Sequence, residues 1–131
     1  MAKTEPSIDA WLQEAKTDPR AAECGMYLCH DGVVRITPKA QVRKGKQGLP
    51  AVEAVDFSYD AEGVRTAIEA TLHMDGIYYV RVWLNEGVLH VGDSIMHVLI
   101  GGDIRPHVID ALQSLVGTIK NELVVEKEIY A

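Results

Sequence analysis

Three apolar, strand-like runs follow one another between residues 77 and 100, separated only by short turns that contain glycine. Residues 77–84 (IYYVRVWL) are rich in β-branched and aromatic side chains, residues 88–91 are short, and residues 94–100 are apolar again. Such composition favours extended structure, and turns of this length join neighbouring strands. This part of the chain is therefore predicted to form consecutive strands of a mixed or antiparallel sheet.

Further strands and helices are predicted on either side of these runs. Apolar or alternating patterns predict strands at residues 25–30, 52–59 and 122–130, and Asp31-Gly32 is a turn signal before extended structure resumes at residues 33–36. Amphipathic segments predict three helices, with Ser7, Asp60 and Asp103 as their N-caps. Helices mixed with several consecutive strands predict an α+β fold, and 131 residues suit one domain over 1–131.

The charge of the chain is acidic overall but locally basic. The net charge of −6 argues against nucleic acid as the main partner, because neutralising phosphates needs an excess of Lys and Arg. Residues 38–50 (PKAQVRKGKQGLP) combine prolines, glycines and cations, and are predicted to be a flexible basic surface loop. A basic patch on an acidic protein suits a small anionic ligand or an acidic partner tail.

Membrane insertion, secretion and metal binding are not indicated by the sequence. No apolar run reaches the length of a membrane span, and the N-terminus lacks the apolar core of a signal peptide, so a cytoplasmic protein is expected. Cys24 and Cys29 are expected to be reduced thiols. With His30 they give only three clustered candidate ligands, so no metal site is predicted.

Two lysines near the C-terminus are the candidate catalytic residues. Lys120 lies close to the apolar face of the third predicted helix, and Lys127 shares strand parity with Val125 and Ile129. Partial burial would lower the pKa of such a lysine and prepare its amine for nucleophilic or acid–base work. The alternative is that both are surface lysines whose stems cover apolar neighbours.

Two arginines are candidate anion-binding residues. Arg35 precedes the basic loop, and Arg105 lies in the first turn of the third predicted helix, after Gly101-Gly102, which would let a ligand approach the backbone. Arg105 and Lys120 are fifteen residues apart, or about 22 Å along a helix. If both serve one site, they come from different copies of the chain, as in a twofold dimer.

Several motifs occur in a characteristic order. A Gly-x-Val-Arg motif at residues 32–35 is followed by a basic, glycine-containing loop at residues 43–48 and a Gly-x-Leu-x-Val-Gly-Asp turn at residues 87–93. Arg105 then precedes Lys120 and Lys127, and an acidic residue, Glu128, follows the second lysine. In this order and spacing the chain resembles the large subunit of molybdopterin synthase.

The chain also departs from the pattern of that family. Ile104 stands where the family has a histidine before the arginine, and Val124-Val125-Glu126 replaces Pro-Ile-Trp before the second lysine. His30 replaces a phenylalanine. These departures concern the site more than the fold.

The resemblance implies an α/β-hammerhead-like fold and a sulfurtransferase. The implied partners are a second copy of the chain and a small ubiquitin-like sulfur-carrier subunit, whose C-terminal Gly-Gly ends in a thiocarboxylate. The implied substrate is cyclic pyranopterin monophosphate and the product is molybdopterin, with no permanently bound cofactor. By position, Lys120 and Lys127 are the catalytic lysines, and the substrate-binding candidates are Arg35, Arg43, Lys44, Gly101, Gly102 and Arg105.

Two other hypotheses remain open at the level of sequence. In the first, the chain is a non-catalytic relative that acts as a dimeric binding or assembly module. In the second, it is an unrelated small α+β domain. The unrelated domain would bind an anionic metabolite through the basic loop and Gly101-Gly102. Both family hypotheses require a dimer, whereas a monomer would suit the unrelated domain.

Overall fold

The computed structural model describes residues 3–131, which form two three-stranded antiparallel sheets and four α-helices. The predicted α+β class is confirmed, although one sheet and about three helices were expected. The elements in chain order are α1 (Ile8–Ala15), a 3₁₀ turn (Ala21–Glu23), β1 (Met26–Val33), α2 (Lys39–Lys44), β2 (Val52–Tyr59), α3 (Ala61–Leu72), β3 (Ile77–Leu84), β4 (Gly87–His90), β5 (Ser94–Gly102), α4 (Arg105–Thr118), a π-helical turn (Ile119–Leu123) and β6 (Val124–Tyr130).

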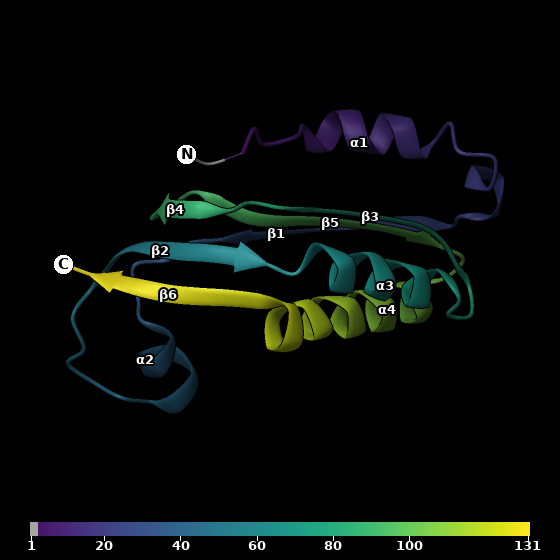
Figure 1. Ribbon diagram of the computed structural model, residues 1–131. Helices are drawn as coiled ribbons and strands as arrows, with labels where there is room; N and C mark the ends of the chain where they lie inside the picture. The colour runs from purple at the N-terminus through teal and green to yellow at the C-terminus, as the bar shows by residue number, and fades with distance from the viewer. Residues whose placement is uncertain (1–2) are drawn as a thin grey trace.

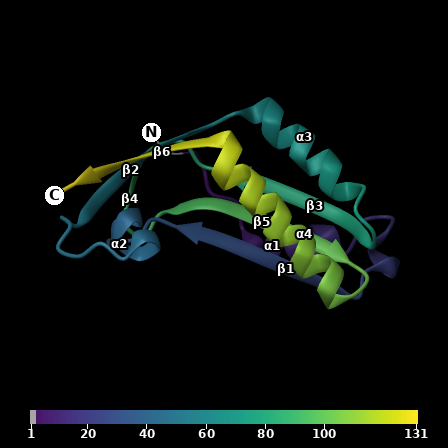
Figure 2. The same cartoon turned by 90° about the horizontal axis from the view of Figure 1, so that it is seen from below.

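The first sheet has the strand order β1-β5-β3, and the second has the order β4-β2-β6. Helix α1 lies on one face of the first sheet, while α3 and α4 lie side by side on its other face (Figure 1). Strand β6 follows α4 and pairs with β2, which precedes α3. The second sheet therefore adjoins the C-terminal end of α4 and the N-terminal end of α3 (Figure 2). The junction between α4 and β6 therefore lies where the helical layer meets the second sheet.

The hydrophobic core has two parts, one on each face of the first sheet. The larger part contains Phe57, Met96, Leu115 and Ile119, all almost fully buried, and lies on the face of the sheet that α3 and α4 cover. The smaller part lies under α1 and is built around Trp11 and its neighbours. Strand alternation divides β5 between these two parts, and each of its nine residues is buried.

Two of the three predicted helix caps are confirmed. Ser7 caps α1 and Asp60 caps α3, each accepting a hydrogen bond from a backbone N–H in the first turn. The prediction of Asp103 as the N-cap of α4 is wrong by one position, because the N-cap is Ile104. The backbone N–H of Asp103 donates to the carbonyl of Gly76 at 2.9 Å, which keeps this residue at the end of the sheet. No helix within residues 3–131 has both the length and the apolar character needed to cross a bilayer.

Two local predictions differ from the structure. The Asp31-Gly32 turn is absent, because both residues pair with β5 and the register shifts only after Gly32. The segment 38–50, predicted to be a loop, contains the short helix α2, which ends at Gly45 with a left-handed φ of 68°. The start of α2 is fixed by a long-range contact, since the backbone N–H of Lys39 donates to Glu128 at 2.9 Å.

Two glycines at the end of β5 allow close packing at the far end of the first sheet. A Cβ atom on Gly102 would lie 2.5 Å from the Gly76 carbonyl oxygen and 2.7 Å from a Val108 methyl carbon. A Cβ atom on Gly101 would lie 2.6 Å from the ring of Tyr27. Both glycines are therefore required by packing between β5, its neighbours and α4.

Alanine substitutions at two glycines, one before the start of α4 and one near its end, are expected to act in opposite directions. Gly102→Ala is expected to lower the free energy of unfolding by about 1–3 kcal/mol, because the new methyl group overlaps backbone and core atoms. Gly117→Ala in α4, where no atom lies within 4 Å of the added Cβ, is expected to raise it by about 0.5–1 kcal/mol. Urea denaturation measures both, and equal effects would contradict the packing argument.

Candidate functional site

A cleft lies between the end of β1, helix α2, the end of α4 and β6. It consists of adjacent cavities of about 50, 260 and 460 Å³ that all share Lys120 as a lining residue. The smallest is bordered by Arg35, Lys39, Lys120, Glu126 and Glu128. The two larger ones are bordered by His30, Arg43 and Lys120, with apolar walls from β1, β5 and α4. Four cations from three separate segments thus converge on one cleft.

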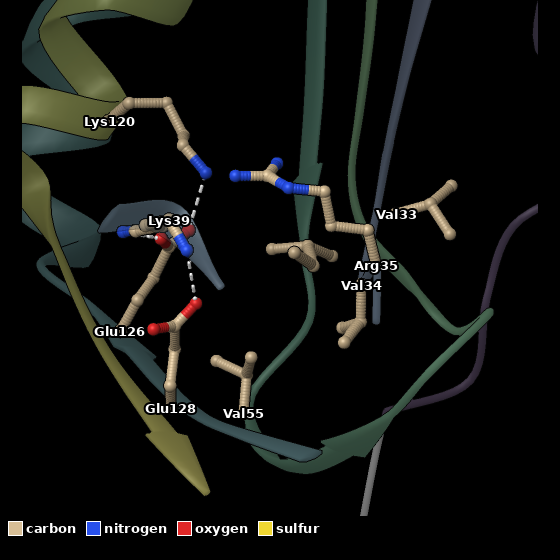
Figure 3. Close-up of a pocket in the computed structure, with 9 residues that line it drawn as sticks. Val33, Val34, Arg35, Lys39, Val55, Lys120, Glu126 and Glu128 are labelled. Carbon is tan, nitrogen blue, oxygen red and sulfur yellow. Dashed lines mark hydrogen bonds and ion pairs between the residues drawn. The ribbon is translucent and has the colours of Figure 1, made fainter. Parts of the chain in front are cut away.

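The local structure explains how these side chains meet. Arg35 follows the register shift that ends β1, and Lys39 opens α2. Lys120 lies in the π-helical turn that links α4 to β6. Figure 3 shows the Arg35 guanidinium and the Lys120 ammonium pointing toward one another across the smallest cavity. Two like charges in this arrangement favour an anion between or beside them.

One buried carboxylate connects two of these cations. The Glu126 side chain is only 4% exposed and accepts a hydrogen bond from Lys120 Nζ at 2.5 Å, while its other oxygen forms an ion pair with Lys39. We call Lys39, Glu126 and Lys120 the cation–carboxylate triad. It ties α2 and the π-helical turn to β6 (Figure 3).

The electrostatics of the cleft shift two pKa values. Burial acts to raise the pKa of Glu126, but hydrogen bonds from Lys120 and Lys39 outweigh it and the pKa falls below 4.5. The pKa of His30 is lowered from 6.5, first by burial and then by the nearby charge of Lys120. Near neutral pH the cleft therefore holds a charged Glu126 and a neutral His30.

The two arginines of the cleft have no such partner. Within residues 3–131, neither Arg35 nor Arg43 has a carboxylate at ion-pair distance, and both are exposed where they border the cleft. A guanidinium presents a planar set of donors that matches phosphate and carboxylate oxygens. The arrangement can therefore bind an anionic group at the arginines, beside an ammonium that already has a carboxylate partner.

Comparison with known proteins gives matches among solved structures alone. No family model and no curated protein matches the chain. A molybdopterin synthase from Staphylococcus aureus superposes with a TM-score of 0.73 at 14% identity, covering 97% of this chain and 88% of that one. A molybdopterin biosynthesis MoaE protein from Burkholderia ambifaria gives 0.71 at 16%, covering 98% and 83%.

A third match is a protein–protein complex of subunits 1 and 2 of molybdopterin-converting factor from Helicobacter pylori. Its TM-score is 0.64 at 16% identity, and the match covers 95% of this chain and 80% of that one. The chain has the MoaE fold. At these identities the matches establish the architecture of the protein, which is that of molybdopterin synthase large subunits.

On this MoaE fold, the predicted site residues divide into two groups. Arg35, Arg43 and Lys120 come together in the cleft. Arg105 lies exposed in the first turn of α4, away from the cleft of its own chain. Lys44 is exposed in the last turn of α2 and does not border the cleft cavities.

Gly101 and Gly102 were predicted to let a ligand approach the backbone, and this is wrong. Both are buried, and the space in front of them is filled by neighbouring rings, methyl groups and backbone. They contribute to the packing of the MoaE fold and are not part of the cleft.

The expected partial burial of Lys127 is also contradicted. Lys127 is exposed, as are Val125 and Ile129, which share its strand face with exposures of 54% and 39%. Glu126 and Glu128 lie on the inner face of β6. Lys39 and Lys120 stabilise the Glu126 carboxylate there, and the backbone N–H of Lys39 donates to Glu128. In one chain, therefore, Lys120 and Lys127 do not face the same cleft.

Sequence reasoning missed the roles of Lys39, Glu126 and His30 in the cleft. Lys39 was one of several cations in a basic segment, and Glu126 was noted only as a departure from the family. Glu126 and Lys120 are separated in sequence by part of a π-helical turn. No spacing rule predicts a side-chain contact across such a turn, so the pair could not be recognised from the sequence.

The two thiols lie outside the cleft cavities and are both free. Burial, assisted by the charge of Asp31, raises the pKa of the Cys29 thiol, which makes it less reactive. Within residues 3–131, no group of three or more His, Cys, Asp or Glu side chains is placed to hold a metal ion.

The triad is expected to make stability depend on pH. Because the pKa of Glu126 is lower in the folded chain, its contribution is present above pH 4.5 and is lost as the pH falls through the lowered value. Glu126→Gln is expected to lower the free energy of unfolding by about 1–3 kcal/mol at pH 7, and the difference should shrink below pH 4.5. Urea denaturation across pH tests this.

The matched control is Glu62→Gln, which removes the same charge from an exposed ion pair with Arg65 on α3. Exposed pairs contribute little, so this variant is expected to change stability far less than Glu126→Gln at pH 7, and to show little dependence on pH. Equal effects of the two variants would show that the triad does not stabilise the fold.

Proposed function

We propose that this protein is a divergent molybdopterin synthase large subunit that acts in molybdenum cofactor biosynthesis. It transfers sulfur from the thiocarboxylated C-terminus of a small ubiquitin-like carrier to cyclic pyranopterin monophosphate, giving molybdopterin. The observation that carries the proposal is the convergence of Arg35, Arg43 and Lys120 on one cleft in a chain with the MoaE fold.

Each cleft residue has a role suited to its chemistry. Arg35 and Arg43, which have no carboxylate partner among the described residues, bind the phosphate of the substrate. Lys120, whose ammonium is held by Glu126, donates a proton to the substrate oxygen that leaves as the carrier's sulfur bonds to the substrate carbon. Water then cleaves the bond between that sulfur and the carrier's acyl carbon, which leaves the carrier as a carboxylate. A second thiocarboxylated carrier supplies the second sulfur of molybdopterin in the same way.

The proposal includes a homodimer with composite sites. Arg105 and Lys127 lie outside the cleft formed by Lys120 of the same chain. A second copy would bring them to the cleft of its partner, so that each site uses residues of both chains. The small carrier is proposed by analogy with the Helicobacter pylori match, which is a complex of two subunits.

Reconstitution tests the proposed chemistry. The protein would be mixed with a thiocarboxylated small subunit and cyclic pyranopterin monophosphate, and molybdopterin would be measured. Product is expected from the wild type, and Lys120→Ala is expected to reduce its rate by about 10²–10⁴-fold, the range typical of a lost acid–base group. Lys127→Ala is expected to reduce it comparably. Normal turnover by Lys127→Ala would remove that residue from the site.

Mixing two inactive variants tests the composite site. Arg105→Ala and Lys120→Ala chains are each expected to be inactive as homodimers, but a mixed dimer contains one site in which both residues are intact. Activity is therefore expected to return on mixing, up to half that of the wild type for a purified mixed dimer. No recovery from the purified mixed dimer, once light scattering shows twice the 14.4 kDa chain mass, would contradict residue sharing between copies.

A second candidate function is a non-catalytic dimeric binding or assembly module. It is favoured by two observations: Glu126 occupies Lys120, and Lys127 faces away from the cleft of its own chain. This candidate predicts a complex with the small subunit but no molybdopterin. Detection of product in the reconstitution would exclude it.

A further inference from the structure

The two ends of the cleft differ in the space that they offer. Around Glu126 the cavity measures about 50 Å³, which is room for only a few water molecules. Around His30 and Arg43 it measures about 260 Å³, and a further 460 Å³ adjoins it. A ligand of phosphate size or larger therefore has room beside His30 and Arg43, whereas side chains fill the space around Glu126; Arg35 and Lys120 border both parts of the cleft.

The two ends also differ in how their charges are balanced. At the filled end, Lys39 and Lys120 both contact Glu126, whose side chain is 4% exposed. At the open end, Arg35 and Arg43 have no carboxylate at ion-pair distance within residues 3–131. His30 lies beside them and, because its pKa is lowered, contributes no charge near neutral pH.

We propose that Glu126 is a specificity-determining residue, which occupies Lys39 and Lys120 and thereby confines the binding of anionic groups in the cleft to Arg35 and Arg43. An anion that bound at Lys120 would have to displace a buried carboxylate and leave it without its hydrogen-bonding partner. Such a displacement is unfavourable, because an unpaired buried charge loses both its partner and its hydration.

This role is specific to Glu126 among the acidic residues of the strand. Glu128 lies two residues further along the same face but contacts the backbone N–H of Lys39 and the hydroxyl of Tyr130, with no contact to Lys120. Glu128 carries the same charge and borders the same cleft. Its substitution therefore distinguishes the effect of pairing with Lys120 from the effect of local charge.

Sulfate binding tests the inference on the intact chain. Sulfate is dianionic at neutral pH, and its binding is followed by NMR at the backbone amides of Arg35, Arg43 and Lys120. In the wild type, sulfate is expected to shift the arginine amides and leave Lys120 unaffected. In Glu126→Gln, Lys120 is expected to respond too, with affinity about tenfold higher, as one additional charge-assisted hydrogen bond would give.

Two further variants complete the comparison. Glu128→Gln is expected to change sulfate affinity by less than about twofold, because screened charges without direct contact interact weakly. Glu126→Gln combined with Lys120→Gln is expected to lose the gain seen in Glu126→Gln alone. Equal gains from Glu126→Gln and Glu128→Gln would overturn the inference, and so would weaker binding by Glu126→Gln.

The wild-type spectrum is decisive even if a variant fails to fold. A sulfate-induced shift at Lys120 as large as that at Arg43 would show that Glu126 does not exclude anions. The inference rests on the anion-binding cleft of the proposed function, but sulfate binding requires neither the small subunit nor turnover. Absence of molybdopterin formation would therefore reject the proposed function and leave this result standing.

Discussion

The burial of β5 is the constraint on which the rest of the structure depends. All nine of its residues are buried, with β1 and β3 on its two edges and helices on both faces. A central strand buried on both sides is largely apolar, and its one ionisable residue, His97, stacks on Trp83 at 5.2 Å between ring centroids. Its Nε2 lies 3.2 Å from the carboxylate of Glu5 without an aligned hydrogen bond, so stacking between the rings is the contact that holds it in place.

The same constraint determines where the cleft forms. Pairing with β5 keeps β1 extended through Asp31 and Gly32, and the register shift that follows directs the chain toward Arg35. On the other face, α4 packs against β5 and ends in the π-helical turn that carries Lys120. The cations therefore reach the cleft because elements anchored on one buried strand end at the same place (Figures 2 and 3).

Local patterns predicted the fold better than the site. β3 was predicted at its observed bounds, because β-branched and aromatic residues favour a strand wherever it lies. Ser7 and Asp60 were identified as caps, since capping acts within one helical turn. The face of β6 was misjudged because apolar parity normally marks the buried side, whereas here distant lysines stabilise the two carboxylates on that side. Interactions of this kind depend on tertiary structure, and no spacing rule encodes them.

The triad also bears on why the chain departs from the family pattern. A tryptophan before the second lysine, as in the family, would give the inner face of β6 an apolar side chain and leave Lys120 without an internal partner. Glu126 instead pairs with that lysine and with Lys39 of α2, so that both ammonium groups at this end of the cleft have a carboxylate partner within the chain. The unpaired charge of the cleft is then concentrated on Arg35 and Arg43, so selection of an anionic ligand falls to two guanidinium groups and the neutral imidazole beside them.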